Sequence, residues 1–158
     1  MSSALITGSF DPITLGHVDI IRRTAKIFDS VTVCVFVNTE KKTMFTAEQC
    51  REMIGLAVKD IPNCRADSTE MTVAGYAKQG GYTAIVRGIR GESDVEYELM
   101  VADVNRKICG IETIFMPAEA AYSRISSTVA RDMIKYGLPL EDWVPASVTE
   151  YIRSLERK

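Results

Sequence analysis

Short, nearly continuous apolar runs alternate along the chain with longer segments in which apolar residues recur every three or four positions. The clearest run covers residues 31–37 and is rich in β-branched side chains. Runs of this kind are typical of strands that are buried on both faces, as in a parallel sheet. The pattern predicts strands over residues 3–8, 31–37, 64–69, 84–86 and 111–116, of which 64–69 has the weakest apolar character.

The segments between these runs have the periodicity of amphipathic helices. Helices are predicted over residues 15–28, 46–60, 72–79, 94–108, 126–136 and from 145 towards the C-terminus. Thr46 and Gln49 have the spacing of a capping box, Ser126 is a suitable N-cap, and Gly137 is a suitable residue to end a helix. The helix over 94–108 begins with acidic residues and ends with basic ones, which complements the helix dipole.

Strands and helices alternate from end to end, without repeats, linkers or low-complexity tracts. This order predicts an α/β fold in which right-handed crossovers build an open parallel sheet of about five strands, with helices on both faces. A chain of 158 residues is long enough for one domain with a substantial core, so we expect a single domain over 1–158. Ligands of such sheets bind beyond the carboxyl ends of the strands.

Composition and charge narrow the function classes. The chain is 46% apolar and 25% charged, as expected of a globular protein, and its net charge of −2 argues against nucleic acid or a membrane surface as a partner. No apolar run approaches the ~20 residues of a membrane span, and the N-terminus does not resemble a signal peptide. The four cysteines are scattered and there is one histidine, so we expect no zinc site and a cytoplasmic location.

The most informative stretch runs from Gly8 to His17, between the first predicted strand and the first predicted helix. Its glycines let the backbone approach a ligand closely, and His17 lies at the opening of the helix. The first N–H groups of a helix have no intrahelical partners, and the helix dipole favours negative charge there. The stretch therefore predicts a binding site for a nucleotide phosphate.

Three further polar segments follow predicted strands, over residues 38–42, 87–91 and 122–128. Together with the first stretch they would place lysines, arginines, one histidine and several hydroxyl groups at one edge of the sheet. Nucleotidyl transfer depends mostly on positioning and charge stabilisation, which such groups supply.

Each segment also has a simpler structural interpretation. His17 alone could cap or pack a helix, and Lys41 and its neighbour could lie in a solvated loop. Arg87 to Arg90 could form a turn whose arginines pair with Glu92, Asp94 or Glu96. Ser126 to Thr128 could be an ordinary helix cap. The convergence of all four on one edge favours function. Three other classes lack their motifs: no phosphate loop indicates an ATPase of that type, no G-x-G-x-x-G indicates a dehydrogenase, and no G-x-S-x-G or second histidine indicates a hydrolase.

The chain resembles the nucleotidyltransferase superfamily. Thr14 to His17 match its first signature, T/H-x-G-H, and Ile125 to Thr128 match its second, I-S-S/T-S/T. Within the superfamily it is most similar to the bacterial phosphopantetheine adenylyltransferases, in the opening G-S-F-D-P-I-T-L-G-H, in Lys41 to Phe45, and in Arg87 to Arg90 followed by Asp94 and E-Y-E at 96–98. Ser9 stands where many members have threonine, and Tyr122 where many have tryptophan.

This resemblance implies a Rossmann-like fold and a defined reaction. ATP and 4′-phosphopantetheine would give dephospho-coenzyme A and pyrophosphate, the penultimate step of coenzyme A synthesis, by direct in-line attack and with Mg²⁺ held mainly by the nucleotide phosphates rather than by protein ligands. Family members are typically homohexamers and are inhibited by coenzyme A. Two rivals stay open: a nucleotidyltransferase for another acceptor, such as nicotinamide mononucleotide or glycerol phosphate, and a non-catalytic sensor of nucleotides.

The resemblance also implies roles for individual residues. Those expected to catalyse the reaction are His17, Lys41, Arg90 and Ser127. Those expected at ATP are Ser9, Phe10, His17, Gly88, Ile89, Arg90, Glu98, Ser123, Arg124, Ile125, Ser126, Ser127, Thr128 and Val129. Those expected at 4′-phosphopantetheine are Ser9, Lys41, Val73 and Arg87, with the lysine and arginine on its phosphate. Within this scheme His17 donates a hydrogen bond to the α-phosphate as negative charge develops there.

Overall fold

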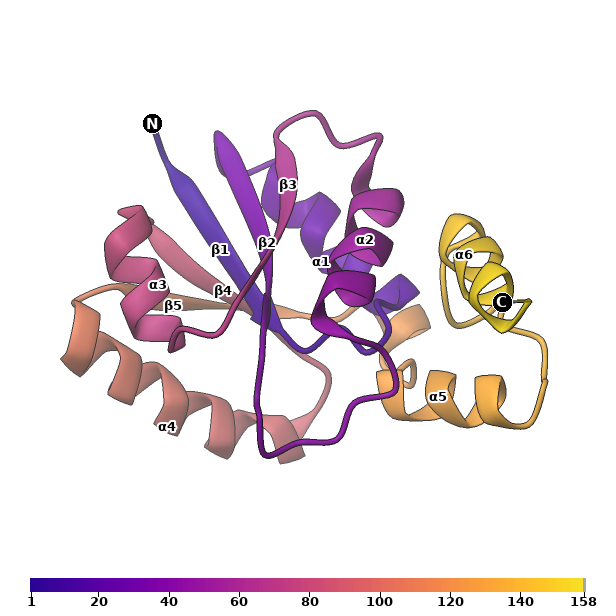
Figure 1. Cartoon of the computed structure of the whole chain (residues 1–158). Coiled ribbons are helices and arrows are strands. Elements are labelled where there is room, and N and C mark those ends of the chain that lie inside the picture. Colours follow the sequence, from indigo (N-terminus) through magenta and orange to yellow (C-terminus); the bar gives the residue numbers. More distant parts are fainter. Residues whose placement is uncertain (158) are drawn as a thin grey trace.

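A computed structural model describes residues 1–157, and its centre is a five-stranded parallel sheet in the order β3-β2-β1-β4-β5 (Figure 1). The strands are β1 Ser3–Gly8, β2 Ser30–Phe36, β3 Cys64–Thr69, β4 Ala84–Ile89 and β5 Glu112–Pro117. Every neighbouring pair is parallel. The α/β class, the parallel sheet and its Rossmann-like order are confirmed, including the weak strand over 64–69.

Helices cover both faces of this sheet (Figure 1). They are α1 Leu15–Ala25, α2 Ala47–Val58, α3 Val73–Gly80, α4 Glu92–Cys109, α5 Ser127–Lys135 and α6 Ala146–Glu156, with a short 3₁₀ turn at Ala120–Tyr122. α1 and α2 lie on one face and α3 and α4 on the other, while α5 and α6 extend the layer of α1 and α2. None of these helices, within residues 1–157, is long and apolar enough to cross a membrane.

The central strands supply both cores. Ala4 and Ile6 of β1 pack into the larger cluster with α1, α2 and α6, whereas Leu5 packs into the smaller cluster under α3. Successive side chains of a strand point to opposite faces, so a strand covered on both sides must be apolar at every position. This is why the apolar runs of β1 and β2 are continuous rather than alternating.

Some boundaries differ from the predictions. β4 continues past Val86 to Ile89, where Arg87 and Gly88 pair with Phe115 and Met116 of β5. Arg87 therefore lies within a strand rather than in the segment after it. The first helix ends at Ala25 instead of continuing to residue 28, because Lys26 and Ile27 donate to carbonyls three residues back and tighten the chain into a turn.

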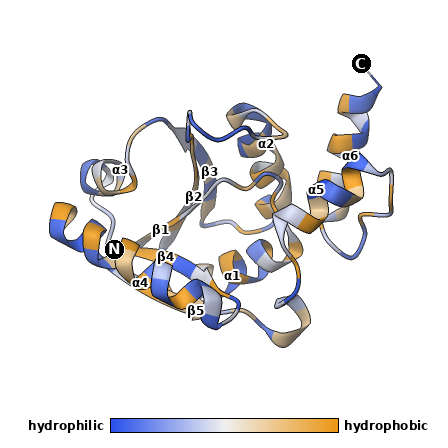
Figure 2. Cartoon of the chain, turned by 90° about the horizontal axis from the view of Figure 1, so that it is seen from below, coloured by the Kyte–Doolittle hydropathy of each residue, from blue (hydrophilic) through white to orange (hydrophobic). Residues whose placement is uncertain are grey.

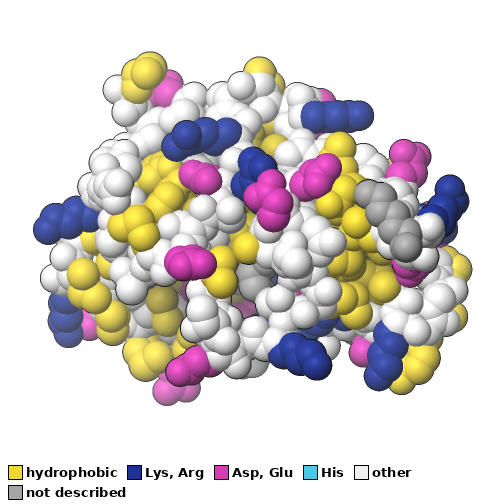
Figure 3. Space-filling model, viewed as in Figure 1, with side chains coloured by type: hydrophobic (Ala, Val, Ile, Leu, Met, Phe, Trp, Pro, Cys, Tyr) yellow, Lys and Arg dark blue, Asp and Glu magenta, His cyan; other side chains and the backbone are white. Residues whose placement is uncertain are grey.

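The surface carries charges of both signs. On the face shown in Figure 3, acidic and basic side chains are interspersed, in keeping with the small net charge. Any concentration of positive charge for an anionic ligand must therefore be local.

Candidate active site

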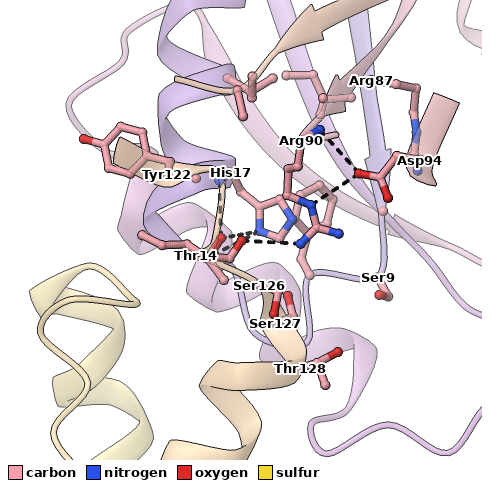
Figure 4. A pocket seen from close by; sticks show the side chains of 18 of the residues that line it. Ser9, Thr14, His17, Arg87, Arg90, Asp94, Tyr122, Ser126, Ser127 and Thr128 are labelled. Carbon is pink, nitrogen blue, oxygen red and sulfur yellow. Dashed lines mark hydrogen bonds and ion pairs between the residues drawn. The ribbon is translucent and has the colours of Figure 1, made fainter. Parts of the chain in front are cut away.

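A cavity of about 300 Å³ lies beyond the carboxyl ends of β1 and β4 (Figure 4). All four polar segments identified in the sequence contribute to its wall, although they are far apart along the chain. The predicted residues that line it are Ser9, Phe10, His17, Lys41, Arg87, Gly88, Arg90, Glu98, Ile125, Ser126, Ser127 and Thr128. The others, Ile89, Ser123, Arg124, Val129 and Val73, are not part of this wall.

The turn after β1 forms the floor of the cavity. Phe10 is buried and has a positive φ of 45°, a conformation that places its ring back over the end of β1. A Cβ atom at Gly8 would lie 3.1 Å from that ring, which is closer than side chains ordinarily approach. The Phe10 ring also meets the His17 imidazole edge-on, with 5.0 Å between centroids. Glycine at position 8 thus leaves room for the Phe10 ring, which packs against the His17 imidazole.

A capping box at the start of α1 fixes the orientation of His17. Thr14 Oγ1 accepts from the His17 backbone N–H at 3.3 Å, and the Thr14 backbone N–H donates to His17 Nδ1 at 3.1 Å. Because a backbone N–H can only donate, Nδ1 must be unprotonated, and the neutral ring then carries its proton on Nε2. The imidazole is therefore oriented as a hydrogen-bond donor at Nε2.

The surroundings keep this ring neutral. Burial, with the positive charges of Arg90 and Arg87, lowers the pKa of His17 from 6.5 to about 4. At neutral pH the imidazole is therefore uncharged. Its Nδ1 accepts the Thr14 N–H and its Nε2–H stays available as a donor. This matches the role expected for a group that stabilises an oxyanion without exchanging a proton with it.

Arg87 is already occupied by protein groups. Its Nε donates to Glu98 Oε2 at 2.9 Å and its Nη2 to Glu98 Oε1 at 2.6 Å, while Nη1 donates to the carbonyl and the hydroxyl of Thr7. An arginine has five N–H donors, so a single one is left for a ligand unless Glu98 moves aside. Bidentate hydrogen bonding of Arg87 to a phosphate would therefore have to replace part of its contact with Glu98.

The other cations are more available. Lys41 lines the cavity, and no carboxylate among residues 1–157 forms an ion pair with it. Arg90 lies 3.5 Å from Asp94 and its side chain is 47% exposed, with a further bond to the Ile125 carbonyl at 3.4 Å. The pairing with Asp94 is one of those that the simpler interpretation of this segment had suggested. It leaves most of the guanidinium facing the cavity (Figure 4).

The start of α5 lines the side of the cavity opposite Lys41. Ser126 caps the helix by accepting from the Val129 N–H at 3.2 Å, and the next residues present the first turn to the cavity. Ser127 Oγ donates to the Pro12 carbonyl at 2.8 Å and so joins this helix to the turn after β1. An open helix N-terminus with serine and threonine hydroxyls is a favourable site for phosphate oxygens.

The structure adds residues that the sequence alone did not single out. Thr14 orients His17, and Arg131 lines the cavity and donates to Thr128 Oγ1 at 3.2 Å. Arg131 could have been found from its spacing, because it lies one helical turn after Ser127 and shares its face. Tyr122, which stands at the tryptophan position of the resembled family, also lines the cavity.

A second cavity of about 200 Å³ adjoins the first and shares Arg87 and Glu98 with it. It lies between the sheet and helices α3 and α4. Val73 is found here, and the remaining wall is largely apolar apart from Thr7, Asn105 and Thr113. Asn105 is 8% exposed and its side chain has no hydrogen-bond partner among residues 1–157; Thr113 Oγ1 is buried and also unpaired there. The Arg87–Glu98 pair therefore separates a polar cavity from a narrower, mostly apolar one.

The carboxylates that line the first cavity are poorly placed to bind a metal ion by themselves. Within residues 1–157 there is no cluster of three or more histidine, cysteine, aspartate or glutamate side chains that could hold a metal ion. Asp94 and Glu98, which line the first cavity, are paired with Arg90 and Arg87. A divalent cation at this site would thus depend on the ligand for most of its oxygen donors.

Comparisons with solved structures identify the fold. A protein assigned as a nicotinate-nucleotide adenylyltransferase from Vibrio parahaemolyticus superposes with a TM-score of 0.68 at 18% identity, covering 96% of this chain and 99% of the other. The nicotinic acid mononucleotide adenylyltransferase of Plasmodium falciparum, in complex with NaAD, superposes with a TM-score of 0.72 at 15% identity, covering 98% and 95%. At these identities the likeness concerns the fold.

The sequence comparison is more specific. Residues 5–133 match the cytidylyltransferase-like family, and this range contains most of β1, all of β2 to β5 and every residue that lines either cavity. The chain belongs to the cytidylyltransferase-like family of nucleotidyltransferases.

Proposed function

We propose that this nucleotidyltransferase transfers AMP from ATP to the phosphate of 4′-phosphopantetheine, giving dephospho-coenzyme A and pyrophosphate. The observation that carries the proposal is the second cavity. It shares Arg87, which is expected at the acceptor phosphate, with the first cavity, and its largely apolar wall contains the Asn105 amide and the unpaired Thr113 hydroxyl. An acceptor with a phosphate at one end and a long arm containing amides fits both features.

The reaction needs no general base. An oxygen of the acceptor phosphate, already ionised at neutral pH, forms a bond to the α-phosphorus of ATP. The bond from that phosphorus to the α–β bridging oxygen breaks, and its electron pair leaves with pyrophosphate. Catalysis is then positioning and charge stabilisation, as in other transfers at phosphorus.

The cavity supplies a group for each step. His17 Nε2–H donates to the α-phosphoryl oxygens, where negative charge increases in the transition state. Lys41 holds the acceptor phosphate as a point charge, with Arg87 beside it. Arg90 and the N-terminal turn of α5, including Ser127, bind the phosphates that leave as pyrophosphate. Mg²⁺, bound mainly by the phosphate oxygens of ATP, would neutralise part of their charge.

A nucleotide acceptor is the second candidate. One superposed structure is the nicotinic acid mononucleotide adenylyltransferase of Plasmodium falciparum, and the other is assigned as a nicotinate-nucleotide adenylyltransferase, so the fold accommodates that chemistry. Such an acceptor carries a ribose and an aromatic ring in place of a flexible arm. A narrow second cavity of about 200 Å³ favours the arm. The non-catalytic sensor is the third candidate, and a second phosphate site beside ATP argues against it.

One assay distinguishes the three. Pyrophosphate release is measured with ATP and, in turn, 4′-phosphopantetheine, nicotinic acid mononucleotide and glycerol 3-phosphate, and the adenylylated product is identified by mass. We expect turnover with 4′-phosphopantetheine alone. Turnover only with the mononucleotide would contradict the proposal, and no turnover with any acceptor would favour the sensor.

A variant of the second cavity tests where the acceptor binds. Ala102→Phe places a ring in that cavity, and we expect the KM for 4′-phosphopantetheine to rise by at least about tenfold while the KM for ATP changes little. The matched control is Ala146→Phe, the same replacement at an exposed position on α6. Equal KM values for the acceptor in both variants would remove the second cavity from the proposal.

A further inference from the structure

The segment that carries Lys41 ends at Phe45, which packs into the larger core cluster, but it has few hydrogen bonds to the rest of the chain. It connects β2 to α2 past the carboxyl ends of the strands and contains neither helix nor strand between residues 38 and 45 (Figure 1). Its internal hydrogen bonds are local: the Lys41 N–H donates to the Asn38 carbonyl at 3.1 Å, and Thr43 Oγ1 donates to the Phe45 carbonyl at 2.8 Å. These turns shape the segment but do not place it over the cavity.

Asp11 provides the connection. The Met44 N–H donates to Asp11 Oδ2 and the Phe45 N–H donates to Asp11 Oδ1, each at 2.9 Å. Among the described residues these are the only hydrogen bonds that join residues 38–45 to the rest of the chain. Asp11 is 3% exposed, so water does not compete effectively for its carboxylate.

Asp11 is itself held from the other side. Its carbonyl accepts from Arg131 Nη1 at 2.7 Å, and the same nitrogen lies 3.8 Å from Asp11 Oδ2. Since Ser127 of the same helix also donates to the Pro12 carbonyl, the turn around Asp11 is fastened to α5. Asp11 thus joins the Lys41 segment to the helix whose N-terminus lines the opposite wall.

We propose that Asp11 is a positioning residue that acts on the reaction through Lys41, by holding residues 38–45 at the distance from α5 that both substrates require. This inference rests on the proposed function for the existence of a transfer to an acceptor phosphate, but not for the identity of the acceptor. The carboxylate matters because two N–H donors need two acceptor oxygens. An asparagine offers one oxygen and would turn an N–H group towards the second donor.

The first test needs no substrate. Amide hydrogen exchange is compared in the wild type, Asp11→Asn and the control Thr46→Ala, which removes the cap of α2 next to this segment without touching Asp11. We expect Met44 and Phe45 to exchange at least about tenfold faster in Asp11→Asn than in either other protein. Unchanged exchange at both amides would overturn the proposal. If Asp11→Asn does not fold, as judged by circular dichroism, Asp11→Glu is measured instead, because it keeps both oxygens and changes only their distance.

The second test asks whether Asp11 acts through Lys41. Steady-state KM and kcat are measured for Asp11→Asn, Lys41→Ala and the double variant. We expect Asp11→Asn to raise the acceptor KM by about tenfold with little change in the KM for ATP, and to add less than about twofold in the Lys41→Ala background. Additive effects would mean that Asp11 supports the fold alone, and would overturn the proposal.

The two proposals fail in different ways. If the acceptor panel identifies another phosphate compound, the proposed function is wrong, and the cycle is repeated with that acceptor. Non-additivity would then still support the role of Asp11, and additivity would still overturn it. If no acceptor reacts, there is no reaction for Asp11 to assist and both proposals fail, whatever the exchange rates show.

Discussion

His17 shows how one hydrogen bond selects among the chemical roles of a side chain. A histidine can act as a base, a metal ligand or a hydrogen-bond donor. Here the Thr14 N–H occupies Nδ1 at 3.1 Å, and the pKa of His17 is lowered to about 4 by burial and by Arg90 and Arg87. The ring is neutral at physiological pH and has its proton on Nε2, which suits a donor to a developing oxyanion.

The titration of His17 tests this directly. It is the only histidine, so its imidazole nitrogens give one pair of NMR signals. We expect an apparent pKa near 4, with Nδ1 unprotonated above it. Arg90→Gln should raise the pKa of His17, since it removes a positive charge that contributes to the shift. A midpoint near the ordinary value of about 6.5 in the wild type would contradict the orientation proposed for the ring.

The same shift affects stability with a definite sign. Because the pKa in the folded state lies below that of the unfolded chain, the unfolded state binds the proton first as the pH falls. The contribution of His17 to folding stability is therefore constant above about pH 6.5 and declines as the pH falls towards 4. Urea unfolding of the wild type and His17→Gln over this range should show a smaller pH dependence in the variant.

Replacing His17 tests its place in the mechanism. His17→Ala should lower kcat by about a hundredfold to a thousandfold, with only a few-fold change in the KM for ATP, because the lost hydrogen bond strengthens in the transition state. His17→Gln places an amide N–H near the position of Nε2 and should recover part of the loss. Equal kcat values for His17→Ala and the wild type would exclude His17 from the transition state.

At the scale of elements, the important contact joins the end of β4 to helix α4. Arg87 continues the strand beyond the predicted boundary, and Glu98 meets it from the helix at 2.6 Å, between the two cavities. Glu98, predicted at ATP, faces the arginine predicted at the acceptor. The contact shows that Glu98 orients the Arg87 guanidinium.

A pair of variants separates stability from binding at this contact. Arg87→Ala should raise the acceptor KM more than the KM for ATP, and should also lower the melting temperature, because it leaves the buried Glu98 carboxylate without its partner. Adding Glu98→Gln should restore part of the melting temperature but not the KM. If both KM values rose equally in Arg87→Ala, the arginine would not belong to the acceptor site.

At the scale of the whole molecule, helix α4 presents an apolar stripe to solvent. Tyr97, Met100, Val104 and Ile108 follow one another at helical spacing and are between 48% and 62% exposed. Figure 2 shows hydrophobic and hydrophilic residues alternating along α4. Contiguous apolar surface of this kind marks an interaction site more often than a solvated face. We therefore propose that the chain forms a homo-oligomer through α4, with the hexamer implied by the family resemblance as the expected size.

Sedimentation velocity tests the oligomer. The wild type should sediment as an assembly larger than one chain, and Met100→Lys with Val104→Lys should shift it towards the monomer. The control is Leu138→Lys, an equally exposed apolar residue outside α4. A monomeric wild type would contradict the expectation, and dissociation caused by the control would place the interface elsewhere.

Local pattern was sufficient to predict which strands and helices form and in what order. Continuous apolar runs determined the buried strands, the 46–49 and 126 caps began helices where predicted, and the glycine-containing turn before His17 indicated a phosphate site. These features depend on residues close together in the sequence, so their physics is visible there. The family signatures then limited the chemistry to nucleotidyl transfer.

The tertiary structure decided which groups are free to act. The sequence does not reveal that Asp11 accepts hydrogen bonds from amides more than thirty residues away. Nor does it reveal that Glu98 pairs with Arg87. It also could not place Val73 in a separate cavity from the nucleotide site. Such contacts depend on strand order and on how helices pack across the sheet, and no local period encodes them. The sequence by itself determined the order of strands and helices and the likeness to nucleotidyltransferases, while packing decided which charges are available at the cavity and which only position the others.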